Sequence, residues 1–351
     1  MFLTTIKQPG VFQEAIPPVP MAKYAHFVVL RETESFALFQ TDQQLNFAKV
    51  REGRTQEGQA ISRIVLFKRK QTTPERLTGR ELLRRYGLTS IVRDTPTYCE
   101  YNSERFCKVC PDCIYYGFAI GNEGSERSKV MVDSAFSLSN YDESHQSLTF
   151  NAPYEHGTMS QGGETRSSFG EQDHVLPQIF FPSVITVRDP TEAEFIYVLN
   201  NILRTKRYGA QTTRTGSLEN HLVGVIFADG EIFSNLKLTQ MLYEKLPKGL
   251  DGKPEKGPYP SGLLKQEVEN LLDELLKEDR VSSYKLVGPE LAALVEEVGG
   301  LVSNEARLQE VLRQAYAESS TYARTYGAKA DKKSGGKGKG KGDKAVTGEE
   351  Q

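Results

Sequence analysis

The N-terminal part of the chain alternates apolar and polar positions with a period of two. The segment 21–40, MAKYAHFVVLRETESFALFQ, has two such runs separated by RETES, which predicts a β-hairpin. AISRIVLFKR at 60–69 predicts a strand that ends in positive charge. SKVMVDSAFSL at 128–138 and HLVGVIFADGEIF at 221–233 predict further strands. The first two thirds of the chain are therefore rich in β-structure.

Helical periodicity first appears in LTGRELLRRYG. Thr78 and Glu81 match a capping box, and Gly87 suits a left-handed helix end, so we predict a short helix between Thr78 and Gly87. On this helix Arg80 and Arg84, four residues apart, are expected to lie together on an open face.

A strand followed by a helix is predicted over 183–209. Asp189 is the expected cap and Pro190 the expected first helical residue. The apolar stripe of this helix consists of Phe195, Val198, Leu199 and Ile202. From Pro260 onward, amphipathic segments predict a helical C-terminal portion, and the Gly- and Lys-rich segment 327–351 is expected to be disordered.

Composition limits the class of protein. With 38% hydrophobic and 26% charged residues the chain can form a globular core, and it has no run of eighteen apolar residues and no signal-like start. We therefore expect a cytoplasmic protein without membrane contact. The formal net charge is only −2, so any nucleic-acid binding must come from local basic patches.

The chain has four cysteines, in the order C-x7-C-x2-C-x2-C. Four thiolates so close in sequence can surround one tetrahedral zinc ion, and four protein ligands leave no position for a reactive water. We therefore predict a structural zinc site that stabilises a loop poor in apolar residues. The predicted metal ligands are Cys99, Cys107, Cys110 and Cys113.

Other ligand sets stay open for this segment. One of the five histidines could replace a cysteine. An iron–sulfur cluster is the competing hypothesis, because CxxCxxC opens a ferredoxin motif, although the next ligand of that motif would fall at Gly117. Free thiols are the third possibility.

Basic residues concentrate in loops that also contain Gly, Thr or Gln, a composition suited to phosphate. A helix start at Gly79 would add free amides for an anion. Each stretch alone is more often a solvated surface, but their recurrence at strand ends favours RNA binding. The candidate RNA-binding residues are Arg51, Arg54, Arg63, Lys68, Arg80, Arg84, Arg85, Arg207, Gln211 and Arg214.

No catalytic motif is present in the sequence. GNEGSE and GAQTTRTG match neither GxxxxGK[ST] nor GxGxxG, so we predict neither an NTPase nor a dinucleotide site. The histidines are scattered, and Asp42 is expected to be a turn residue. His156 and His174, in the polar insertion 140–182, are the histidines best suited to contact a ligand. We expect a protein that is not an enzyme.

The order of these segments resembles the RAMP superfamily of CRISPR proteins, specifically the backbone subunit of type I-D interference (Cascade) complexes. A glycine-containing turn into a short basic helix is matched by 78–85, and the family's strand ending in Asp-Ala by VDSA at 132–135. The glycine-rich basic loop is matched by 209–216. The resemblance covers about 23–233.

The resemblance implies an α+β fold: a ferredoxin-like, RRM-like antiparallel sheet of four strands with helices on one face. It also implies a core over 1–233 with a Cys-rich metal loop at 95–125 and a thumb-like hairpin at 140–182, followed by a helical portion at 234–326. The sheet lacks an obvious aromatic RNP signature, so base stacking on its face is not expected.

The function implied by the resemblance is a filament subunit. Such subunits stack head to tail along a CRISPR guide RNA (crRNA) and leave its bases free to pair with target DNA in antiviral defence. The expected partners are the guide RNA, target DNA, copies of the chain itself and the other subunits of the effector complex. Two alternatives stay open: a RAMP-type endoribonuclease that uses His156 or His174, and a zinc-stabilised adaptor that binds proteins through the C-terminal helices.

Overall fold

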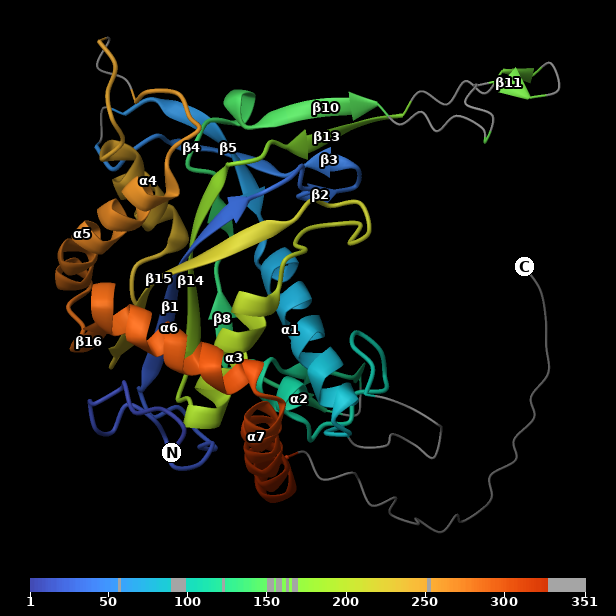
Figure 1. The fold of residues 1–351 in the computed structure, drawn as a ribbon, viewed down its shortest axis with the longest axis vertical. Helices are drawn as coiled ribbons and strands as arrows, with labels where there is room; N and C mark the ends of the chain where they lie inside the picture. The colour runs from blue at the N-terminus through green and yellow to red at the C-terminus, as the bar shows by residue number, and fades with distance from the viewer. Residues whose placement is uncertain are drawn as a thin grey trace, which may run out of the picture.

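A computed structural model gives the fold of the protein (Figure 1). The residues that it describes are 1–55, 58–89, 99–121, 124–149, 155, 160–161, 164–165, 170–250 and 254–327. Three predicted features fall on residues outside these ranges. They are the disordered tail, apart from residue 327, the residue His156, and much of the predicted thumb at 140–182.

The centre of the molecule is an antiparallel sheet that, among the described residues, has five strands. Their order is β16 (Ser283–Leu286), β15 (Leu218–Ala228), β1 (Tyr24–Thr33), β14 (Phe180–Arg188) and β8 (Val130–Val132). With helices α1 and α3, the chain order β1-α1-β8-β14-α3-β15 is that of a ferredoxin-like unit, with β16 added at one edge. The predicted α+β class and antiparallel core are confirmed.

The predicted hairpin at 21–40 is wrong. β1 pairs with β14 and β15 along its length, with Phe27 opposite Ile185 on one side and Val225 on the other. The segment after β1 leaves this sheet, and Ala37 instead bridges Val175. The physical reason is that β1 is apolar at successive positions and buried on both faces, which suits the middle of a covered sheet.

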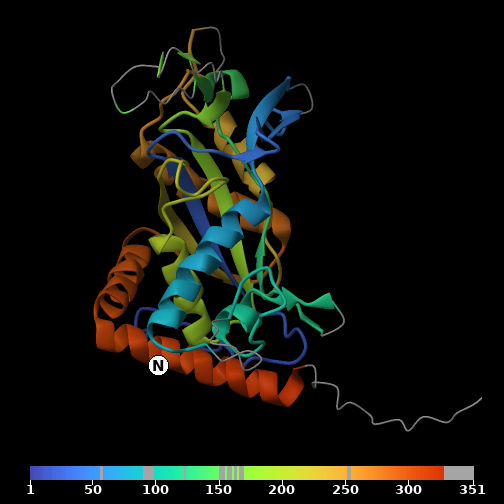
Figure 2. The same cartoon turned by 90° about the vertical axis from the view of Figure 1, so that its right-hand side faces the viewer.

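Helices cover both faces of the sheet, whereas the resemblance implied helices on one face. One face packs against α1 (Lys68–Arg85), α3 (Glu192–Arg204), α6 (Gly288–Ser303) and α7 (Glu305–Tyr326). Figure 2 shows α7 lying beneath this side.

The opposite face packs against α4 (Asn235–Glu244) and α5 (Ser261–Asp279). Val28 and Val184 of the sheet contribute to this second core together with Leu272 of α5. In ordinary RRM proteins this is the face on which bases stack, and here side chains of α4 and α5 cover it. The C-terminal helices therefore complete the core, which the sequence pattern did not indicate.

Helix α1 has 18 residues and begins at Lys68, not at Thr78. Gly79 therefore lies inside the helix and supplies no free helix-start amides. A Cβ atom at Gly79 would lie 2.4 Å from both Asn201 Nδ2 and Tyr197 Oη of α3. The glycine is needed because α1 and α3 cross closely at this point, and the prediction of an anion-binding helix start is wrong.

Helix α3 has the predicted stripe, since Phe195, Val198 and Leu199 are fully buried. Its cap differs from the prediction, because the hydroxyl of Thr191 accepts the hydrogen bond from the backbone N–H of Glu194. Asp189 instead accepts hydrogen bonds from the backbone N–H groups of Met21 and Lys23, and it lies before the helix, which begins at Glu192.

The remaining strands form small sheets at the edge of the core. They are β2 (Gln40–Thr41) with β3 (Gln44–Leu45), β4 (Phe47–Arg51) with β5 (Ala60–Leu66) and β9 (Ala135–Phe136), β6 (Phe118–Ala119) with β7 (Ser125–Glu126), β10 (His145–Thr149) with β13 (Glu171–Val175), and β11 (Ser160–Gln161) with β12 (Glu164–Thr165). Short helices α2 (Pro111–Tyr115) and η2 (Tyr141–Glu143) complete the fold. The hairpin of β10 and β13 projects from the body (Figure 1).

Candidate metal centre and nucleic-acid interface

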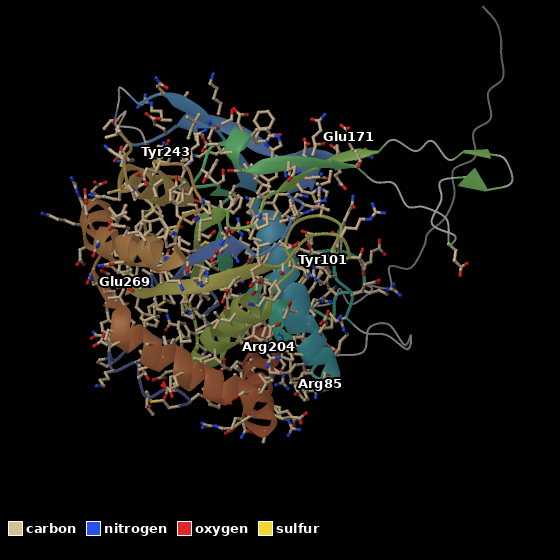
Figure 3. All side chains as sticks on the ribbon, turned by 45° about the horizontal axis from the view of Figure 1, so that its top comes forward. Arg85, Tyr101, Glu171, Arg204, Tyr243 and Glu269 are labelled. Carbon is tan, nitrogen blue, oxygen red and sulfur yellow. The ribbon has the colours of Figure 1, made fainter. Side chains whose placement is uncertain are left out.

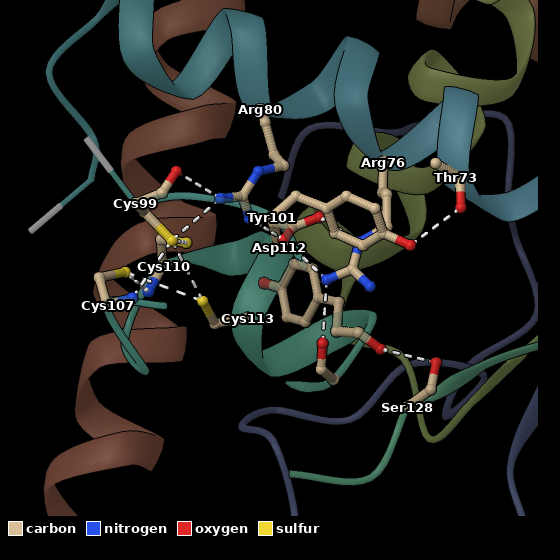
Figure 4. Close-up of polar contacts among 12 residues, drawn as sticks. Thr73, Arg76, Arg80, Cys99, Tyr101, Cys107, Cys110, Asp112, Cys113 and Ser128 are labelled. Carbon is tan, nitrogen blue, oxygen red and sulfur yellow. Dashed lines mark hydrogen bonds and ion pairs between the residues drawn. The ribbon is translucent and has the colours of Figure 1, made fainter. Parts of the chain in front are cut away.

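The four cysteine sulfurs lie together, all within 4.8 Å of one another. Individual Sγ–Sγ distances are 3.5 Å for Cys99–Cys113 and 3.9 Å for both Cys107–Cys113 and Cys99–Cys110. A regular tetrahedron with metal–sulfur bonds of about 2.3 Å has sulfurs about 3.8 Å apart. The arrangement therefore fits a single tetrahedral ion (Figure 4).

Local backbone geometry explains how four nearby residues converge. Cys110 caps α2 and Pro111 begins it, so Cys113 lies one turn further along the same short helix. Backbone N–H groups of Cys107 and Cys110 donate to the sulfurs of Cys99 and Cys107, at 3.2 and 3.3 Å. These bonds stabilise negative charge on sulfur. Within the described part of the chain, no histidine belongs to this group.

A buried ion cluster connects the cysteine loop to α1 (Figure 4). Asp112 accepts from Arg76 Nε at 3.0 Å and Nη2 at 2.8 Å, and it also pairs with Arg80. Arg80 donates through Nη2 to the carbonyl oxygen and the sulfur of Cys99. Burial alone would lower the pKa of Arg80, but Asp112 and Cys99 raise it above its ordinary value.

The prediction that Arg80 lies on an open face is therefore wrong. Its side chain is 1% exposed, because the cysteine loop packs over this position and supplies Asp112 and Cys99 as its partners. Arg84 is exposed, as predicted. The two arginines do not form a shared basic surface.

Arg63 is also buried, with a fully enclosed side chain on β5. Its Nη1 donates to the carbonyl oxygens of Ser137 and Leu138, and its Nη2 donates to that of Glu52 at 2.8 Å. Burial lowers the pKa of Arg63 to about 10. This arginine joins strand segments, so neither Arg63 nor Arg80 can reach a phosphate in this conformation.

The exposed candidates lie at separate places. Arg51 and Arg54 are on the β4–β5 hairpin. Nη2 of Arg54 lies 3.7 Å from Oε2 of Glu278. Lys68 begins α1 and Arg85 ends it, so their Cα atoms lie about 25 Å apart at 1.5 Å per residue. Arg85, labelled in Figure 3, pairs with Glu305 at 3.3 Å, and ion pairs this exposed contribute little stability.

The basic loop after α3 is held against the segment that follows β1. The backbone N–H of Leu38 donates to Thr215 Oγ1 at 3.0 Å, and that of Gly216 donates to the Phe36 carbonyl at 2.7 Å. A Cβ at Gly209 would lie 2.3 Å from the Leu38 carbonyl oxygen. The glycines therefore permit close packing within the protein. The exposed side chains of this loop include Arg207, Gln211 and Arg214.

A buried polar network that the sequence did not indicate supports this loop. Arg31 of β1 donates to Glu75 of α1 at 2.8 Å and to Asn220 of β15 at 2.7 Å. Tyr208 donates to the same Glu75 oxygen at 3.0 Å and accepts from Asn220. The Arg31 guanidinium also lies 4.7 Å from the Tyr208 ring centre. No local motif marks these residues, because they come from three distant regions of the chain: β1, α1, and the loop after α3 together with β15.

Asp42 behaves as predicted, whereas His174, which the sequence favoured as a ligand contact, is buried. Asp42 is a turn residue with φ +52° between β2 and β3. His174 is 5% exposed and its Nδ1 hydrogen-bonds to the Gln172 carbonyl, so it does not face solvent as a catalytic group would. Within the described residues, no helix is both long and apolar enough to cross a membrane.

The fold belongs to the RRM-like class, because its core is ferredoxin-like. It adds a loop with four clustered cysteines, a hairpin of β10 and β13, and helices over the face on which an RRM binds RNA. Comparison with protein families identifies the family within this class. Residues 11–312 match the family described as Csc2 Crispr, and the chain belongs to this family of CRISPR proteins.

A solved structure of the same family supports the fold. The crystal structure of Csc2 from Thermofilum pendens aligns with a TM-score of 0.57 at 16% identity, over 93% of this chain and 96% of that one. A chain of a structure titled "CRISPR RNA-guided surveillance complex" aligns with a TM-score of 0.44 at 11% identity, over 79% of this chain and 98% of that one. No curated protein matches the chain.

Proposed function

We propose that this protein is a guide-RNA-binding backbone subunit of a type I-D CRISPR interference complex. It holds the guide so that its bases pair with target DNA. The observation that carries the proposal is membership of the Csc2 family across residues 11–312, which includes the core, the cysteine loop, α4 to α6 and the beginning of α7.

RNA binding in this proposal uses exposed cations around the core rather than the sheet face. Arg63 and Arg80 are left out because their side chains are buried and fully engaged with the protein. The remaining candidates are Arg51, Arg54, Lys68, Arg84, Arg85, Arg207, Gln211 and Arg214. Contacts of this kind fix the RNA backbone and carry no sequence information, which suits a protein that must accept any guide.

Assembly in this proposal is head to tail. The hairpin of β10 and β13 extends from the body and is the candidate thumb that reaches a neighbouring copy over the RNA. An interface whose rotation does not close generates a helical filament, which matches a linear guide.

The cysteine site is proposed to hold structural zinc. The sulfur spacing supports one ion rather than a multi-iron cluster, whose ligands must surround several metal atoms. Four thiolates close the coordination sphere, and no catalytic constellation accompanies them in the described residues. The protein is therefore proposed to be non-enzymatic, and the buried His174 gives no support to the endoribonuclease alternative.

The test is size-exclusion chromatography of the purified protein with absorbance at 260 and 280 nm, repeated after nuclease treatment. We expect large species that carry RNA and dissociate when RNase is added. Cleavage of CRISPR repeat RNA by the isolated protein would favour the endoribonuclease. A protein free of nucleic acid that also fails to bind added single-stranded RNA would refute the proposal and favour the adaptor.

A further inference from the structure

Arg80 is the most unusual side chain near the cysteine cluster. Arginine is rarely buried, yet Arg80 is 1% exposed and its Nη2 lies 3.2 Å from the sulfur of Cys99. The same Nη2 donates to the Cys99 carbonyl oxygen, so this nitrogen is held beside one metal ligand. The ring of Phe106, centred 5.7 Å from the guanidinium carbon, covers the arginine.

Among the described side chains around Arg80, the positive charges outnumber the negative ones unless the cysteine sulfurs are counted. Arg76 and Arg80 bring two positive charges to a single carboxylate, Asp112. Among the described residues, one positive charge is therefore left over in a buried region, where an uncompensated charge is costly. The nearest described groups that can carry the matching negative charge are the thiolates, because Arg80 already touches Cys99.

A tetrathiolate site has the opposite imbalance. Four thiolates around a divalent ion carry a net charge of −2 in a mostly buried loop. An N–H donor and a positive charge beside a sulfur lower the cost of that charge, and outer groups of this kind tune metal affinity.

We propose that Arg80 is a positioning residue of the metal site. It donates to the Cys99 thiolate and neutralises part of the charge of the centre, while Asp112 holds its guanidinium in place. The inference rests on the proposed metal site. It also means that metal binding and the docking of α1 on the cysteine loop stabilise each other, because the same side chain serves both.

The experiment is titration of the metal-free full-length chain with Co²⁺, followed by competition with Zn²⁺. We expect Arg80→Met to weaken metal binding by about 10–100-fold. The sulfur-to-cobalt charge-transfer band should also move to longer wavelength, because loss of the donor raises the energy of the sulfur lone pairs. Arg69→Met, on an exposed position of the same helix, is the control and should change neither.

Each outcome has a distinct meaning. Wild-type protein that binds no Co²⁺ would refute the metal site itself. Wild-type binding with an unchanged affinity and band in Arg80→Met would overturn the role of Arg80. Weaker binding without a band shift would show a purely structural effect and would also overturn it. If Arg80→Met does not fold, Arg80→Gln, which also removes the positive charge, replaces it, and an unchanged affinity and band there would likewise overturn the role of Arg80.

Discussion

Breaking the buried pair of Arg31 and Glu75 should cost far more than breaking an exposed pair. Both side chains are 0% exposed and their N–O distance is 2.8 Å. Glu75→Leu leaves the Arg31 guanidinium buried without its carboxylate and removes the acceptor of Tyr208. Removal of one partner of such a pair costs about 3–5 kcal/mol.

The cost can be converted into a melting temperature. With about 2.1 cal/mol/K of unfolding entropy per residue, the 351-residue chain gains about 0.7 kcal/mol/K on unfolding. Loss of about 3–5 kcal/mol therefore lowers Tm by roughly 4–7 °C. The assay is thermal unfolding followed by circular dichroism.

The matched control and the double variant make the reasoning refutable. Glu305→Leu breaks the exposed pair with Arg85, in which the side chains are 62% and 65% exposed, and should cost less than about 1 kcal/mol. Arg31→Met combined with Glu75→Leu should cost much less than the sum of the single changes. Additive losses, or a Glu75→Leu cost no larger than that of the control, would refute the argument.

Other predictions test the interface, a buried acid and the metal site. The double variant Arg84→Glu and Arg214→Glu should weaken the salt dependence of RNA binding, measured by filter binding. The slope of log affinity against log salt concentration should fall in magnitude by about 0.7 for each lost phosphate contact. An unchanged slope would exclude both residues from the RNA interface. Burial raises the pKa of Glu194 to about 8, so wild-type stability should fall as pH rises from about 4.5 to 8. In urea unfolding at pH 7, Glu194→Gln should gain up to about 3 kcal/mol over wild type, and a gain that persists at pH 4.5 contradicts this origin. Cys110→Ser should lower both bound zinc, measured by metal analysis, and Tm, and full metal content would count against its role as a ligand.

Features with a local cause could be predicted from the sequence. The cysteine spacing predicted the cluster because all four residues lie within one short loop and α2. The apolar stripe of α3 predicted its buried face, because helical periodicity and burial coincide there. The family resemblance then predicted the ferredoxin-like core, which periodicity alone did not.

Features that depend on distant segments were missed. The partners of β1 could not be predicted from its own residues, because the residues that pair with it are 148 or more positions away and its pattern is equally compatible with a local hairpin. Arg63 and Arg80 resemble surface cations in the sequence. A positive charge by itself does not show that the folded protein will place a buried carbonyl or carboxylate oxygen beside it.

By itself, the sequence indicated the strand-forming segments, the apolar stripe of α3, the helices after Pro260 and the cysteine cluster, because each follows from spacing within about twenty residues. Only the tertiary structure decided which cations face solvent and which are buried, and that α4 and α5 close the sheet face on which an RRM would stack bases. The physical reason is that burial and charge compensation are properties of packed neighbours. Arg80 reaches the cysteine cluster only when α1 docks on Asp112 and Cys99.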